Sequence, residues 1–242
     1  MKKFWQFRAA TENSSAELLL YGYISESSWW GDEVTPKQFA EDLKALGDIN
    51  ELSVRINSGG GDVFAGQTIY SLLKAHKAKV TVYIDGLAAS IASVIAMSGD
   101  PVVMPKNAMM MIHNPWTWAA GNAQDFRKLA DDLDKIRESM IAVYEDKSGM
   151  EKEKIIELLD AETWLTAKEA KEYGFVDEVS PSQAAAAAGN GYFTAYQQEA
   201  ARLAGLKRIE NAKPKEGSHF KSGSSLNFGC RERHLALIAK KL

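Results

Sequence analysis

The segment YIDGLAASIASVIAMSGD, residues 83–100, changes from a strand pattern to a helix pattern within a few positions. The β-favouring run 79–84 ends in Asp85-Gly86, and an apolar helix follows. Ser90 sits at this junction, where backbone N–H groups and the positive end of the helix dipole can stabilise a developing oxyanion. Serine is also a preferred N-terminal cap, so the segment alone leaves a cap and a nucleophile both open.

Further strand and helix patterns alternate on either side of this segment. Residues 18–24 and 52–57 read as strands, and Thr35-Pro36 has the N-cap and N1 residues that open a helix. The run 101–115, PVVMPKNAMMMIHNP, contributes two more short apolar strands. Strands that alternate with helices imply parallel βαβ units with right-handed crossovers.

Residues 125–144 have the clearest helical period in the chain. The apolar positions recur at steps of three and four: Phe126, Leu129, Leu133, Ile136, Met140 and Val143. This stripe predicts an amphipathic helix that packs on the core or on another subunit. Thr166 to Glu169 is a capping box that opens a short helix, Gly174 suits the position after its end, and 175–179 reads as a closing strand.

The composition is that of an ordinary globular protein, with 45% apolar and 25% charged residues in 242. The single cysteine, Cys230, excludes an internal disulfide and a cysteine-based zinc site, which favours a reducing compartment. The opening residues, MKKFWQFRAATENSS, lack the apolar core of a signal peptide, and no segment is long and apolar enough to cross a membrane. We expect neither a metal nor a cofactor.

The formal charge of −3 is distributed unevenly. Residues 201–242 carry ten Lys and Arg against three Glu, a net +7, which leaves −10 for residues 1–200. We expect a flexible N-terminus over 1–15, a compact domain over 16–180, and a low-complexity, basic, partly disordered extension over 181–242. The acidic body argues against nucleic-acid binding by the core. The basic extension is either a solvated tail or a docking segment for an acidic protein or DNA.

A serine nucleophile needs a base, and histidine is the usual base near neutral pH. Of the four histidines only His113 follows an apolar strand and precedes a chain-turning Asn-Pro, although a structural strand-end histidine would look the same. The glycines 59–61 follow another strand and can expose backbone N–H groups to an oxyanion or a phosphate. A phosphate loop would need a Lys-Ser/Thr pair after its glycines, but Asp62 follows here.

Four motifs in order resemble the Clp-type serine peptidases, the ClpP family. They are RINSGGGDVFAGQTIY, DGLAASIASVIAMSGD, NAMMMIHNP and AETWLTAKEAKEYGFVDEV, and with the residues between them they cover about 16–180. Within that family, the segment YGYISESSWWGDEVTPKQFAEDLKAL is similar to the phage branch, the head maturation or prohead proteases. The resemblance implies an α/β fold built as the ClpP/crotonase-type spiral of ββα units, with the 125–144 helix as a protruding handle.

The resemblance also implies a role for individual residues. Ser90 matches the nucleophile and His113 the general base, while Gly61 and Ile91 match the two backbone N–H donors of the oxyanion hole. The third member of the triad is an aspartate in the family. The ungapped match here is Glu162, with Asp160 as the alternative if the loop is shifted by two residues, and Gly59 replaces a proline of the housekeeping members.

These matches imply a serine endopeptidase that forms a homo-oligomeric ring and cleaves polypeptides, with or without an ATPase partner. The phage branch points to capsid or scaffold proteins as substrates during head maturation, in the host cytoplasm or within the prohead. Three alternatives differ in chemistry. A Ser/Lys peptidase would use a lysine such as Lys106, a crotonase-fold enzyme would act on acyl-CoA, and an inactive relative would serve in capsid assembly or scaffolding.

Overall fold

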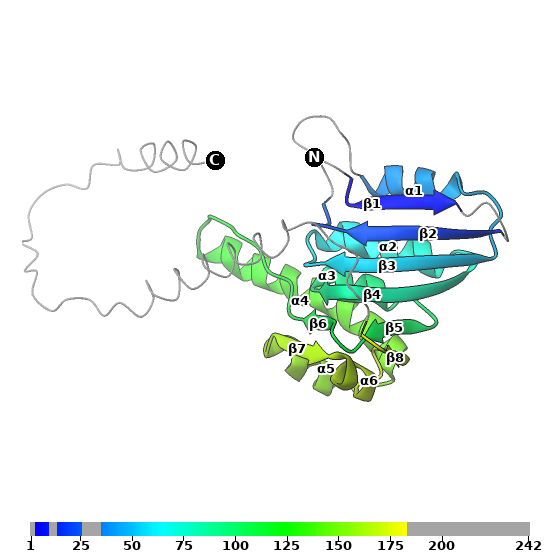
Figure 1. The fold of residues 1–242 in the computed structure, drawn as a ribbon. Coiled ribbons are helices and arrows are strands. Elements are labelled where there is room, and N and C mark those ends of the chain that lie inside the picture. Colours follow the sequence, from blue (N-terminus) through cyan, green and yellow to red (C-terminus); the bar gives the residue numbers. More distant parts are fainter. Residues whose placement is uncertain (1–2, 10–13, 26–34, 183–242) are drawn as a thin grey trace, which may run out of the picture. The chain divides into compact units, whose positions relative to one another are not determined.

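The computed structural model describes residues 3–9, 14–25 and 35–182, and it has an eight-stranded sheet with helices in this part of the chain (Figure 1). The strands are β1 (Trp5–Ala9), β2 (Ser15–Tyr21), β3 (Glu51–Ser58), β4 (Lys79–Ala89), β5 (Val102–Pro105), β6 (Met109–Ile112), β7 (Thr163–Thr166) and β8 (Glu178–Ser180). The helices are α1 (Pro36–Lys44), α2 (Val63–Lys74), α3 (Ile91–Ala96), α4 (Ala123–Ser148), α5 (Lys152–Asp160) and α6 (Ala167–Glu172).

The main sheet has the order β1-β2-β3-β4-β5-β8, and all of its neighbours except β1 and β2 run parallel. β4 is long enough to have two partners in succession along one edge. Val82 and Tyr83 pair with β5, and residues 87–89 pair with β6, which pairs in turn with the antiparallel β7. The carboxyl ends of β2, β3, β4 and β6 therefore meet at one edge, where sites gather in open parallel sheets.

A bulge in β4 explains why the strand is longer than its sequence pattern predicts. Ile56 pairs with Ile84, but Ser58 pairs with Ala88, so β4 has two more residues than β3 over this interval. Asp85-Gly86, which we had predicted to end the strand, lie inside this irregularity, and the strand continues to Ala89. Bulges of this kind bend a strand and re-aim the side chains beyond it. The next residue is Ser90.

The hydrophobic core lies between the sheet and the helices. Alternate residues of β2 and β3 are buried, and Figure 1 shows α2 behind these strands and α1 beside β1. α3 is the most enclosed of the described helices, because all six of its residues are buried. Gly66 in α2 permits this packing, since a Cβ there would stand 2.2 Å from Cγ1 of Ile91. The start of α3 is therefore set by close contact with α2.

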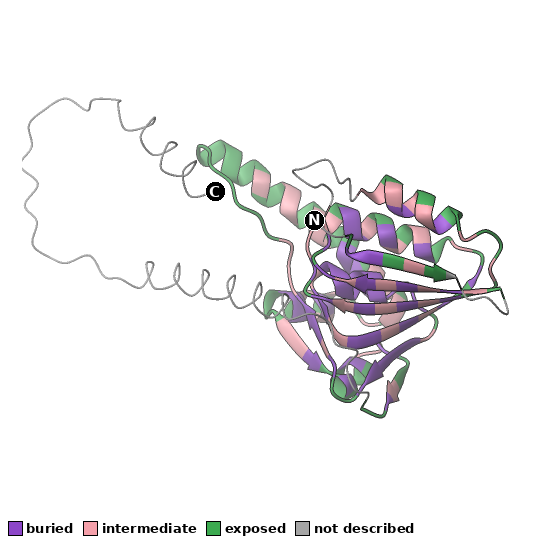
Figure 2. Ribbon diagram, turned by 45° about the horizontal axis from the view of Figure 1, so that its top comes forward, coloured by how far each residue is buried: buried purple, intermediate pink, exposed green. Residues whose placement is uncertain are grey.

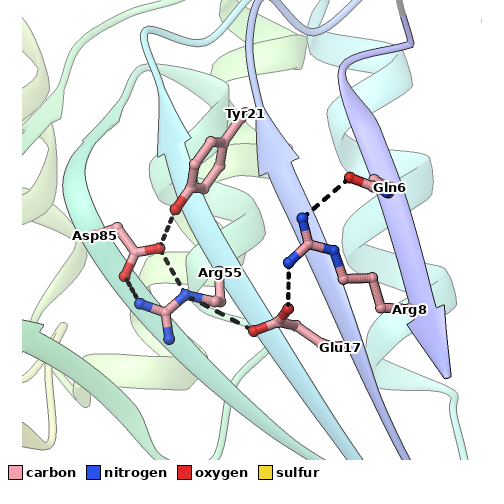
Figure 3. A network of polar contacts seen from close by, with 6 residues as sticks. All are labelled: Gln6, Arg8, Glu17, Tyr21, Arg55 and Asp85. Carbon is pink, nitrogen blue, oxygen red and sulfur yellow. Dashed lines mark hydrogen bonds and ion pairs between the residues drawn. The ribbon is translucent and has the colours of Figure 1, made fainter. Parts of the chain in front are cut away.

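The opposite face of β1 to β4 carries a polar network (Figure 3). Asp85 is buried and accepts hydrogen bonds from the Tyr21 hydroxyl and from Nε and Nη2 of Arg55. Burial, reinforced by the Asp85 charge, raises the pKa of Tyr21 to about 12. The guanidinium of Arg55 also lies 4.0 Å from Glu17, which Arg8 contacts at 3.4 Å. The network thus joins four strands and neutralises the charge of Asp85.

α4 has an exposed first half and a packed second half, as Figure 2 shows by colour. Asn122 and Asp125 form a capping box at its start, and Gly149 ends it in the left-handed conformation. Met140, Ile141 and Tyr144 are buried against the body of the domain. The predicted amphipathic helix over 125–144 is confirmed, and it extends a few residues further at each end. Its exposed first half corresponds to the predicted protruding handle.

The predicted α/β class is confirmed, but several elements were not foreseen. β1 lies within the N-terminal segment for which no strand was predicted, α5 and β7 are additional elements, and the closing strand is only residues 178–180. The predicted tail lies outside the described residues, and the boundaries of the three regions stay predictions. No helix among the described residues is long and apolar enough to cross a membrane.

Candidate active site

Ser90 occupies a strained turn between β4 and α3. Its backbone has φ 55° and ψ −132°, a conformation that a non-glycine residue adopts only where the surrounding structure enforces it. Its N–H donates to the carbonyl of Met111, and its own carbonyl accepts from the N–H and the hydroxyl of Ser93. Ser90 occupies the N-cap position of α3, but its side chain makes no capping hydrogen bond to the helix.

The hydroxyl of Ser90 instead contacts His113. Oγ of Ser90 and Nε2 of His113 are 2.8 Å apart, because β6 runs beside the end of β4 and His113 directly follows β6. Burial lowers the pKa of His113, and the charge of Glu162 partly opposes that shift. The neutral imidazole is therefore favoured at neutral pH. With its proton on Nδ1, it accepts the hydroxyl proton of Ser90 at Nε2.

The two candidate carboxylates differ in what they contact. Oε2 of Glu162 lies 4.0 Å from Nδ1 of His113, beyond hydrogen-bond distance, and the side chain is 56% exposed. Asp160 is held elsewhere, because its Oδ1 accepts from Asn114 at 2.7 Å and lies 3.4 Å from Arg137. Of the two, Glu162 is the carboxylate whose charge affects the pKa of His113, while Asp160 joins the segment after His113 to α4.

The glycine loop after β3 lies directly against Ser90. A Cβ on Gly60 would stand 2.6 Å from Cβ of Ser90, and Gly60 has φ +96°, so only glycine fits there without strain. A Cβ on Gly61 would stand 1.9 Å from the carbonyl oxygen of Ile24. Among the described residues, the N–H groups of Gly61 and Ile91 donate to no other group. Both are therefore available to an oxyanion.

Two positioning serines escaped the sequence analysis. Ser58 is buried, donates to the carbonyl of Gly22 and accepts from the N–H of Gly60, and thereby holds the glycine loop. Ser93 is buried and lies between the Ser90 carbonyl and the hydroxyl of Tyr144 in α4. Ser58 directly precedes the glycines 59–61, so its position in the sequence could have marked it as a residue that holds the glycine loop. Nothing in the sequence marks the pairing of Ser93 with Tyr144.

Lys106 is far less suited to activate Ser90 than His113. It is exposed in the turn between β5 and β6, and its backbone N–H donates to Ser180 of β8. Among the described residues, no group of three or more His, Cys, Asp or Glu side chains is arranged to hold a metal ion. The groups at the site are thus a hydroxyl, an imidazole, a carboxylate and two backbone donors, the set that acyl transfer by a serine hydrolase requires.

Comparison with known proteins identifies the class to which this fold belongs. The Clp protease family matches residues 32–183, more than half of the chain. The chain belongs to the Clp protease family, and its class is therefore that of a peptidase.

The individual relatives carry the same name, ATP-dependent Clp protease proteolytic subunit. The protein of Bacteroides fragilis is 34% identical over 154 residues, which cover 61% of this chain and 74% of the relative. That of Bacteroides thetaiotaomicron is 32% identical over 154 residues, covering 61% and 70%. That of Leuconostoc citreum is 36% identical over 141 residues, covering 57% and 70%.

Proposed function

We propose that this chain is a serine endopeptidase of the ClpP type, with Ser90 as nucleophile and His113 as general base. The observation that carries the proposal is the 2.8 Å contact between Oγ of Ser90 and Nε2 of His113 at a strained turn. Strain of this kind persists only where the surrounding structure enforces it, and it gathers at active sites. The pair also lies at the carboxyl edge of the parallel strands, beside two unoccupied backbone donors.

The chemistry follows from these atoms. His113 removes the hydroxyl proton as Oγ of Ser90 attacks a peptide carbonyl, and the N–H groups of Gly61 and Ile91 hold the resulting oxyanion. The imidazolium then gives its proton to the leaving amine, and the C–N bond breaks to leave an acyl-enzyme. Water, deprotonated by His113, attacks the ester, and Ser90 departs with the returned proton.

Glu162 takes the role of the triad carboxylate in this proposal. Its negative charge raises the pKa of His113 against the effect of burial, so it favours the imidazolium that forms during attack. Oε2 of Glu162 lies 4.0 Å from Nδ1 of His113, so its charge stabilises the imidazolium without a hydrogen bond. The exposed side chain can also move closer and form that hydrogen bond. A glutamate can replace the aspartate of such triads.

The substrate we propose is a polypeptide, cut by a homo-oligomeric ring of this chain. The resemblance of residues 21–46 to phage head maturation proteases supports capsid or scaffold proteins as the natural substrates, in the host cytoplasm or the prohead. The relatives are named as ATP-dependent proteases, so their activity depends on ATP. An ATPase partner for this chain is a separate proposal, and the cleavage chemistry above does not require it.

The distance between Glu162 and His113 favours one alternative, an inactive member of the family that serves in assembly or scaffolding. The crotonase-type alternative has lost its support, because the chain belongs to the Clp protease family. A fluorophosphonate probe separates an active from an inactive protein, since it forms a covalent bond only with an activated serine.

The test compares Ser90→Ala with Ser71→Ala, a matched exposed serine on α2. We expect the wild type and Ser71→Ala to react with the probe and to cleave casein, and a co-expressed capsid or scaffold protein to be shortened. Ser90→Ala should lose labelling and lower cleavage by about 10⁴-fold or more. Cleavage by Ser90→Ala at the wild-type rate would reject the assignment, and no labelling of a folded wild type would favour the inactive alternative.

A further inference from the structure

Asp85 is a buried carboxylate within the sheet. It is 6% exposed, and its oxygens accept hydrogen bonds from the Tyr21 hydroxyl and from Nε and Nη2 of Arg55 (Figure 3). Burial raises the pKa of Tyr21 to about 12, so the hydroxyl keeps its proton and remains a donor. A buried ion pair is often no more stabilising than apolar side chains of similar volume. Stability alone is therefore a weak explanation for these three groups.

The three groups meet at the bulge of β4. Between Ile84 and Ala88, β4 has three residues where β3 has one, and Asp85 is the first of the three. A slip of one residue in such a strand would turn every side chain beyond it to the other face of the sheet. Arg55 and Tyr21 hold the carboxylate of Asp85 on the outer face, and so they fix the residue at which the bulge begins.

The strands that Asp85 joins lead directly into the candidate active site. Tyr21 is the last residue of β2, and the next carbonyl, that of Gly22, accepts a hydrogen bond from Ser58, which holds the glycine loop. On β4, the residues after the bulge pair with β6, and the N–H of Ser90 donates to a carbonyl of β6. The nucleophile and the glycine loop are thus both positioned by strands that meet at Asp85.

The arrangement around Ser90 leaves little room for displacement. A Cβ on Gly60 would stand 2.6 Å from Cβ of Ser90, and Oγ of Ser90 lies 2.8 Å from Nε2 of His113. Ser90 has φ 55°, a conformation that the surrounding structure has to enforce. A misplacement of about 1 Å in reacting groups can cost about a hundredfold in rate. The position of the bulge, five residues before the end of the turn, therefore bears on the rate of reaction.

We propose that Asp85 is a positioning residue, which fixes the bulge of β4 and thereby the place of Ser90 beside the general base and the glycine loop. Arg55 and Tyr21 hold its carboxylate, and the effect reaches Ser90 through the backbone of β4. The inference rests on the proposed function and adds the groups that keep its nucleophile in place. Loss of the carboxylate should lower kcat and leave KM nearly unchanged, because the peptide still binds while Ser90 is misaligned.

Asp85→Asn keeps the shape of the side chain and removes the charge that Arg55 binds. We expect the variant to cleave a fluorogenic peptide with kcat roughly tenfold to a hundredfold lower and with KM within about twofold of the wild type. The acid limb of the kcat/KM profile should stay in place, since Glu162 is the charge that affects the pKa of His113. An unchanged kcat, or a change confined to KM, would overturn the proposal.

Asp42→Asn is the matched control. The carboxylate of Asp42, on α1, also accepts hydrogen bonds from three side chains, those of Lys3, Trp5 and Gln38. These contacts join α1 to the N-terminal segment and do not involve β4. We expect Asp42→Asn to lower the urea midpoint of unfolding and to leave kcat unchanged. An equal loss of kcat in Asp42→Asn and Asp85→Asn would assign the loss to general destabilisation and reject the positioning role.

A second variant covers the case in which Asp85→Asn does not fold, because removal of one partner leaves a buried charge unpaired. Tyr21→Phe/Arg55→Met/Asp85→Leu replaces all three polar groups by apolar ones, an exchange that is often neutral for stability. We expect this triple variant to keep a urea midpoint close to that of the wild type and to lose kcat as Asp85→Asn does. A folded triple variant with the kcat of the wild type would show that the bulge is set without Asp85.

Hydrogen exchange keeps this inference apart from the proposed function, because the measurement needs no catalysis. The N–H of Ser90 donates to the carbonyl of Met111 at 2.9 Å, so its protection reports how firmly the turn is held. We expect faster exchange over residues 86–90 in the triple variant than in the wild type, with unchanged protection in α2. Equal exchange would contradict the positioning role even in an active enzyme. Faster exchange in the variant of a protein whose wild type is neither labelled nor active would support the control of the turn by Asp85 and reject the peptidase.

Discussion

On the proposed mechanism the protonation of His113 decides when Ser90 can react, and two opposing effects set the pKa of His113. Burial disfavours the imidazolium and lowers the pKa of His113, whereas the negative charge of Glu162 favours the imidazolium and raises it. Burial is the larger effect, so the pKa of His113 lies below its usual value and the neutral imidazole is favoured at neutral pH. On the proposed mechanism, kcat/KM rises with pH through this pKa and is already at its plateau at pH 7.

Glu162→Gln tests this balance. Removing the negative charge leaves burial unopposed, so the pKa of His113 falls and the acid limb of the kcat/KM profile moves to lower pH. The plateau should also fall, because the imidazolium of the transition state loses its counter-charge. We expect a loss of roughly tenfold to a hundredfold, less than the 10⁴-fold typical of a buried triad aspartate, since Glu162 is exposed.

Asp160→Asn is the matched control for that measurement. Asp160 contacts Asn114 and Arg137, and its effect on His113 would be indirect, through the position of the segment that follows the histidine. We expect the acid limb to stay where it is in the wild type. A shift of that limb in Asp160→Asn but not in Glu162→Gln would reverse the assignment of the third triad member.

At the scale of elements, a chain of hydroxyl groups joins α4 to the turn that holds Ser90. Tyr144 is fully buried, and its hydroxyl lies 2.8 Å from Oγ of Ser93, which donates to the Ser90 carbonyl. Burial raises the pKa of Tyr144 well above its usual range, so the hydroxyl stays protonated. The same helix that projects from the domain is thereby fixed, at its inner half, to the start of α3.

Single and double substitutions measure this link. Tyr144→Phe should lower the free energy of unfolding by about 1 kcal/mol, and Ser93→Ala by about 1–3 kcal/mol because it leaves the buried tyrosine hydroxyl without a partner. The double variant should cost less than the sum, since it removes both polar groups. Urea unfolding measures all three. Costs that simply add would contradict a hydrogen-bonded pair.

The sequence predicts those elements whose signals are local. Thr35-Pro36 and the capping box at Thr166 mark helix starts that the structure confirms, and the stripe of 125–144 marks α4. β1 escaped prediction because its stability depends on distant partners: its pairing with β2, and the indole of Trp5 donating to Asp42 of α1. The bulge in β4 escaped because it is a property of the pairing with β3.

The candidate site likewise has residues with local sequence signals and residues whose contacts depend on distant parts of the chain. Ser90 and His113 were predicted because one lies at a strand-to-helix junction, the other follows an apolar strand, and both match ClpP-family motifs; their side chains lie 2.8 Å apart. The contacts of Asp160 and Glu162 depend on how the chain turns between α5 and β7, where Glu162 has φ +48°. No local pattern predicts a positive φ at a glutamate. The sequence therefore could not predict how far each of the two carboxylates lies from His113.

At the scale of the whole molecule, we predict that the domain ending near residue 180 is sufficient for the chemistry. The buried residues of the described chain extend from Phe4 to Ser180, and β8 adds the last strand to the sheet. The residues assigned to the proposed mechanism all precede Thr163. A domain with its own core and complete site folds and reacts without the segments outside it.

Removal of residues 183–242 tests that boundary. The truncation deletes ten Lys and Arg and four Glu, so the net charge changes from −3 to −9 while the described sheet, helices and site stay in the chain. We expect the urea midpoint of unfolding and the rate of fluorophosphonate labelling of Ser90 to match those of the full chain. A truncated protein that stays folded but is no longer labelled would assign the basic extension a part in catalysis. A truncated protein that unfolds would show that the extension is part of the folded core. Unchanged labelling with loss of capsid or scaffold processing would instead give the extension the role of a docking segment, because positive charge there would then act on the partner and not on the serine.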